Sequence, residues 1–138
     1  MREKLEVKIL IVNHSSEIIT DVVKKLVDEG FSVEIIPLFR PALRRMASGE
    51  IDVSVLSLDL PDVSGAKAVK LAKEVAPHTP IIALVEETSP ELEREVRSLG
   101  VLYYYVLPLE EQGVLYRVIK AALKARHKYI LKRGASPY

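Results

Sequence analysis

The chain has 138 residues, a formal net charge of +1 and no cysteine, and its length suits a single domain of ordinary size. The lack of cysteine excludes disulfides and thiolate metal sites, so we expect a cytoplasmic protein. The first apolar run, of about six residues, is too short for a membrane span or a signal-peptide core.

Five short apolar runs rich in Val, Ile, Leu or Tyr alternate along the chain with segments of helical period. Continuous runs of this kind are typical of strands buried on both faces of a sheet. They cover residues 7–12, 31–36, 53–58, 81–85 and 101–106.

The segments between these runs have recognisable helix ends. Ser or Pro begins three of the predicted helices and Gly ends three of them, as expected for caps. The predicted helices run from Ser15 to Gly30, from Pro41 to Gly49, from Gly65 to just before Pro77, from Ser89 and Pro90 to Gly100, and from Glu110 into the tail.

Strict alternation of strand and helix predicts a doubly wound α/β domain, with a five-stranded parallel sheet and helices on both faces. No Gly-rich turn follows the first strand, which favours the flavodoxin-like strand order 2-1-3-4-5. We expect the domain to cover residues 1–125, with residues 126–138 as a basic extension of the last helix and a C-terminal tail.

Open sheets of this type bind ligands at the carboxyl ends of their strands. The loop after the first strand begins with Asn13 and His14, and the third strand leads into Ser57 and Asp59. The loop after the first strand has none of the glycines of a phosphate-binding loop, so a dinucleotide or nucleoside triphosphate site is not expected.

Four segments resemble the receiver domain of two-component response regulators, the family of CheY-like proteins. They are KILIVNHSSEI, IDVSVLSLDLPDVSG, PIIALVEE and SLGVLYYYVLPL. The spacing of Pro61 and Gly65 sets the register of the comparison. The resemblance implies a signalling module with a cis peptide bond between Leu107 and Pro108.

The residues at the working positions of that family differ here. The resemblance places the two metal-binding acids at Asn13 and His14 and the phosphate-accepting aspartate at Ser57. The hydroxyl of the fourth strand falls on Val85 and the phosphate-binding lysine on Leu107. Magnesium and aspartyl phosphate both require carboxylates. We therefore expect a degenerate pseudo-receiver that is not an enzyme and holds no cofactor or metal.

Two alternatives at this edge depend on Asp59. It lies two residues before Pro61, whereas the family's acceptor lies four residues before it, so Asp59 is a weak substitute acceptor in a residual metal-dependent phosphotransfer. His14 and Asp59 also have ligand types suited to a transition metal, but a third ligand is missing.

The expected task is interaction with another protein, or homodimerisation, through the fourth helix, fifth strand and fifth helix. The expected surface comprises Tyr103, Tyr104, Arg117 and Lys120. In the family, an aromatic residue at the position of Tyr104 changes rotamer when the fourth strand's hydroxyl is drawn to the phosphate. Val85 has no hydroxyl, so this switch is expected to be lost.

The last helix is also strongly basic. Residues 117–133 carry seven Lys or Arg and no acid, whereas the remaining residues carry thirteen basic and nineteen acidic side chains. A nucleic-acid-binding regulator that uses this helix and the tail is therefore the alternative to a protein-binding module.

Overall fold

A parallel sheet with the strand order β2-β1-β3-β4-β5 forms the centre of the computed structural model. The structure describes residues 6–14, 20–109 and 113–132, and for residues 127–132 it describes the helical backbone only. The observed order confirms the predicted flavodoxin-like topology. The strands are β1 (Lys8–Val12), β2 (Ser32–Ile36), β3 (Val53–Ser57), β4 (Ile81–Val85) and β5 (Tyr103–Val106).

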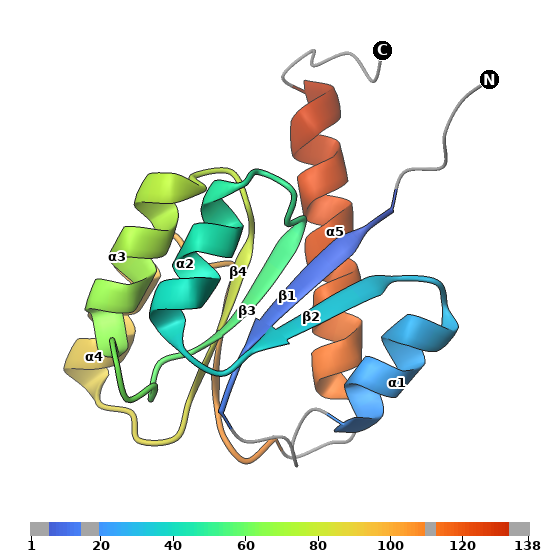
Figure 1. Ribbon diagram of the computed structural model, residues 1–138. Helices are drawn as coiled ribbons and strands as arrows, with labels where there is room; N and C mark the ends of the chain where they lie inside the picture. Colours follow the sequence, from blue (N-terminus) through green and yellow to red (C-terminus); the bar gives the residue numbers. More distant parts are fainter. Residues whose placement is uncertain (1–5, 15–19, 110–112, 133–138) are drawn as a thin grey trace.

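Helices cover both faces of this sheet (Figure 1): α1 and α5 lie on one face, and α2, α3 and α4 lie on the other. Within the described residues, no helix has both the length and the apolar character needed to cross a bilayer. The helices are α1 (Thr20–Asp28), α2 (Phe39–Ala47), α3 (Gly65–Val75), α4 (Pro90–Ser98) and α5 (Val114–Lys132).

Alternation along the strands divides the core into two layers. On β1, Ile9 and Ile11 face the α1 and α5 layer, whereas Leu10 and Val12 face the other helices. All four side chains have no exposed surface, as expected for a central strand with helices on both faces. The edge strands β2 and β5 are only partly buried, because each has a neighbour on one side only.

The helix ends are confirmed in part. Ser89 caps α4 and accepts the Leu92 N–H at 3.0 Å, as the sequence predicts. Helix α2 begins two residues before Pro41, so the predicted start was wrong. The predicted cap at Ser15 and the predicted start of α5 at Glu110 lie outside the described residues.

A remote carboxylate explains the early start of α2. Asp62, in the loop after β3, accepts the backbone N–H groups of Phe39 and Arg40, both at 2.9 Å. Leu38, at the N-cap position, has no side-chain acceptor of its own. Desolvation raises the pKa of Asp62, but several backbone N–H groups, first those of Arg40 and Phe39, together outweigh it and leave the pKa below its usual value.

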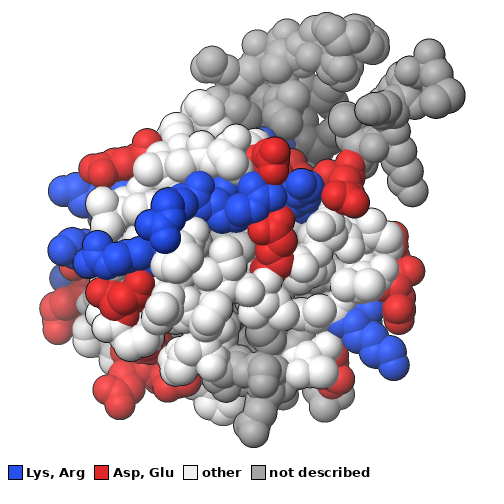
Figure 2. All heavy atoms as spheres, in the orientation of Figure 1, with Lys and Arg blue, Asp and Glu red and all other residues white. Residues whose placement is uncertain are grey.

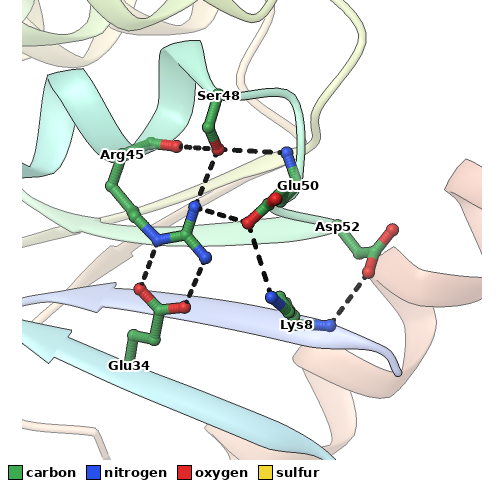
Figure 3. Close-up of polar contacts among 6 residues, drawn as sticks. All are labelled: Lys8, Glu34, Arg45, Ser48, Glu50 and Asp52. Carbon is green, nitrogen blue, oxygen red and sulfur yellow. Dashed lines mark hydrogen bonds and ion pairs between the residues drawn. The ribbon is translucent and has the colours of Figure 1, made fainter. Parts of the chain in front are cut away.

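Charged side chains connect the elements at the amino edge of the sheet (Figure 3). The Arg45 guanidinium on α2 contacts Glu34 on β2 at 2.7 Å and Glu50 at 2.9 Å, and Lys8 on β1 contacts Glu50 at 3.4 Å. Hydrogen bonds from Arg45 hold the pKa values of both glutamates below their usual range. This cluster lies at the edge opposite the expected ligand site, so we assign it a structural role.

Arg126 joins α5 to the same edge. Its guanidinium lies 3.4 Å from the Asp52 carboxylate and donates to the carbonyl of His78 at 3.2 Å. Helix α5 passes through residues 125 and 126 without a break. The boundary expected there therefore falls within a continuous helix whose position is fixed by contacts with the body.

Candidate functional site at the carboxyl edge

Asn13 and Ser57 lie next to each other in the register of the sheet, because Val12 on β1 pairs with Leu56 on β3. Both are buried, and Ser57 is only 5% exposed. The Ser57 hydroxyl has no hydrogen-bond partner among the described residues. This pair combines an amide with an unpaired hydroxyl, which is a poor site for a divalent cation.

Val85 and Leu107 form the second adjacent pair at this edge. The Leu107 N–H donates to the Val85 carbonyl at 2.8 Å, which continues the pairing of β4 with β5. Val85 is fully buried and Leu107 is partly buried against the α1 and α5 layer. The peptide bond between Leu107 and Pro108 is cis, as the sequence comparison predicts.

Asp59 is the acid closest along the chain to Ser57, and its side chain already has a partner. Its Oδ2 accepts the backbone N–H of Glu86, the first residue after β4, at 2.7 Å. His14 is exposed. Within the described ranges, no three His, Cys, Asp or Glu side chains gather as a metal ion would require.

Tyr104 is buried on the α4 side of β5 and is 7% exposed. Its hydroxyl lies 2.7 Å from the Thr88 Oγ1, and the Arg97 guanidinium lies 5.5 Å from its ring centroid. Sequence reasoning missed Thr88, because it sought a hydroxyl only at Val85. The signal was present three residues further along, in the loop that joins β4 to α4.

Comparison with known families tests the resemblance to receiver domains. The family model of the response regulator receiver domain matches residues 9–120. The chain belongs to this receiver domain family. The match begins at the second residue of β1 and ends in the first half of α5, and receiver domains are signalling modules.

Related receivers differ from this chain in most positions. The transcriptional regulatory protein DltR of Streptococcus agalactiae is 27% identical over 111 residues, which cover 80% of this chain and 50% of DltR. This receiver therefore spans about half the length of that relative.

Solved structures show the same fold. A CheY-like receiver domain from Methanospirillum hungatei has a TM-score of 0.79 at 23% identity, covering 90% of this chain and 98% of its own. The chemotaxis protein CheY4 of Vibrio cholerae has a TM-score of 0.72 at 29% identity, covering 86% and 99%.

The receiver's expected interaction residues lie on different sides of β5 and α5. Tyr103 faces the α5 layer and stacks on Tyr105, with the ring centroids 6.0 Å apart, whereas Tyr104 faces α4. Lys120 points toward α1, because its ammonium contacts Glu29 at 2.8 Å. Arg117 is exposed on α5. The structure therefore does not bring these four side chains together as one surface.

Charge is mixed on the surface of this receiver. In Figure 2, Lys and Arg side chains cross the face that contains α2, and acidic side chains lie beside them. On α2, Arg45 forms ion pairs with Glu34 and Glu50. On α5, Lys120 and Arg126 also contact carboxylates of the body. The basic character of α5 in sequence is thus partly neutralised in the fold.

Proposed function

We propose that this receiver is a phosphorylation-independent signalling module that acts by binding another protein or a second copy of itself. One observation carries the proposal: Ser57, at the position of the family's phosphate-accepting aspartate, is buried, and its hydroxyl has no hydrogen-bond partner among the described residues. A serine hydroxyl cannot form an aspartyl phosphate, and Asn13, Val85 and Leu107 add no charge beside it. No enzymatic activity is proposed.

Incubation with acetyl phosphate and Mg²⁺ tests this proposal. Intact-protein mass spectrometry should show no stable phosphoryl adduct. Asp59→Asn is the matched variant, because it removes the acid closest along the chain to Ser57. A stable adduct on the wild type would overturn the proposal, and its loss in Asp59→Asn would identify Asp59 as the acceptor.

The proposed interaction surface is formed by α4, β5 and α5. Two apolar side chains on β5 and just before it support this choice, because Leu102 is 39% exposed and Val106 is 42% exposed. They lie on either side of the buried Tyr104, at the edge of the sheet. No charged residue occurs between Gly100 and Leu109 to protect this edge strand from pairing or association.

A pair of edge-strand substitutions tests the surface. Val106→Lys places a charge on β5, and Ile35→Lys places the same charge on β2, the other edge, at a side chain that is 48% exposed. Light scattering over a concentration and salt series should show weaker self-association, and pull-down from source-cell extract should lose protein partners, only for Val106→Lys. Unchanged association and partners in Val106→Lys would exclude this surface.

A further inference from the structure

The loop that joins β4 to α4 is held by side chains of the chain itself. At its start, the Glu86 N–H donates to Asp59 at 2.7 Å. Two residues later, the Thr88 hydroxyl bonds the Tyr104 hydroxyl at 2.7 Å. The last loop residue, Ser89, caps α4. Contacts thus connect this short loop to the loop after β3, to β5 and to α4.

The first contact gives the Glu86 backbone N–H, at the carboxyl edge of the sheet, a hydrogen-bond acceptor. A backbone N–H at the end of a strand has no ladder partner and must bond water, an anion or a side chain. Asp59 supplies a carboxylate oxygen at 2.7 Å, and hydrogen bonds to an ionised acceptor are short and roughly twice as strong as neutral ones. The chain therefore satisfies this donor without an external anion.

The second contact fixes the rotamer of Tyr104. A buried tyrosine hydroxyl requires a hydrogen-bond partner, which Thr88 provides. The Arg97 guanidinium, 5.5 Å from the ring centroid, adds a cation–π contact from α4. An outward rotamer would lose both contacts and expose the ring, so the inward rotamer is the stable one.

We propose that Asp59 and Thr88 form an internal latch, which holds the β4–α4 loop in place and keeps Tyr104 inward without any phosphoryl group. Glu86, which Asp59 holds, and Thr88, which bonds Tyr104, are separated only by Glu87. Loss of the Asp59 hydrogen bond should therefore weaken the bond between Thr88 and Tyr104. Partners would then meet an α4 and β5 surface of constant shape, and this consequence rests on the proposed function. The latch itself is a property of the isolated chain.

Hydrogen exchange measured by mass spectrometry on peptides from residues 86–98 tests the first contact. Asp59→Ala should speed exchange in these peptides roughly tenfold, because it removes a hydrogen bond to a charged acceptor. Glu87→Ala is the matched control, since it removes an exposed carboxylate of the same loop. Equal exchange in the two variants, with unchanged far-ultraviolet circular dichroism, would overturn the proposal.

The second contact is tested by a double-variant cycle. Thr88→Val and Tyr104→Phe each break the same hydrogen bond, so amide exchange in the double variant should be no faster than in either single variant. Thr88→Ser keeps the hydroxyl and should exchange at the wild-type rate. Additive effects would show that the two hydroxyls act independently and would refute the latch.

Coupling between the two contacts is tested by the rate at which tetranitromethane nitrates Tyr104. Fragment-ion mass spectrometry distinguishes nitration of Tyr104 from that of its neighbours Tyr103 and Tyr105. Asp59→Ala should raise this rate severalfold, whereas Glu87→Ala should leave it unchanged. An unchanged nitration rate in Asp59→Ala would show that the contacts are uncoupled. None of these measurements requires a partner, so their failure is distinct from failure of the proposed function.

Discussion

Two buried hydroxyls on β3, those of Ser54 and Ser57, have no hydrogen-bond partner among the described residues. Ser54 is 1% exposed and Ser57 is 5% exposed, so neither side chain is open to bulk water. A buried polar group without a partner costs about 1–3 kcal/mol of folding free energy. Replacing Ser57 by alanine removes this cost, and the oxygen atom that is lost leaves only a small void.

We expect Ser57→Ala to raise the free energy of unfolding by about 1 kcal/mol, after subtraction of the packing contacts of the lost oxygen. For a chain of this size, that change raises the melting temperature by about 3 °C. Urea unfolding followed by circular dichroism measures it, and the slope of the transition should stay unchanged because the exposed area does not change.

Two other serines complete the experiment. Ser54→Ala should stabilise the protein by a similar amount, because its hydroxyl also lacks a partner in the described part of the chain, although it lies near the amino end of β3. Ser89→Ala should destabilise it by about 1 kcal/mol through loss of the α4 cap. If Ser54→Ala stabilised the protein and Ser57→Ala destabilised it, the Ser57 hydroxyl would have a partner and the reasoning would be refuted.

Three further predictions concern the charged contacts. Arg45 lowers the pKa values of Glu34 and Glu50 below their usual 4.5, so their stabilisation is present above that pH and is lost as the pH falls through the lower folded-state values. When urea unfolding is measured from pH 6 to pH 2, the free energy of unfolding should fall less for Glu34→Gln than for the wild type. Asp62→Ala should speed amide exchange in the first turn of α2 and leave exchange in α3 unchanged. Faster exchange in α3 alone would contradict the capping role. Arg126→Ala should loosen α5 only near its contact with the amino edge, which site-resolved exchange would detect as faster exchange after residue 122.

The fold was predictable because its signals are local. Runs of apolar residues identify the strands, and Ser89 with Pro90 marks the start of α4, since a hydroxyl acceptor and a missing N–H both suit the first turn of a helix. The order of the strands followed from strict alternation and from the absence of a Gly-rich first turn.

Side-chain contacts between distant segments were not predictable in the same way. Asp62 caps α2 from 23 residues away, so the local sequence predicts a helix start at Pro41, two residues too late. Lys120 turns toward Glu29, 91 residues earlier in the chain, which removes it from the surface expected around Tyr104. Helical periodicity identifies the buried face of α5, but the direction of its remaining side chains depends on which neighbour supplies a partner.

The sequence by itself determined the receiver topology, because the topology depends on local pattern and spacing, and the same spacing places Ser57 where we propose a degenerate site. Only the tertiary structure decided that Asp59 bonds the Glu86 N–H and that Thr88 bonds Tyr104. Each of these bonds joins loops or strands 16 or 27 residues apart, and its geometry exists only after β3, β4 and β5 are aligned in the sheet.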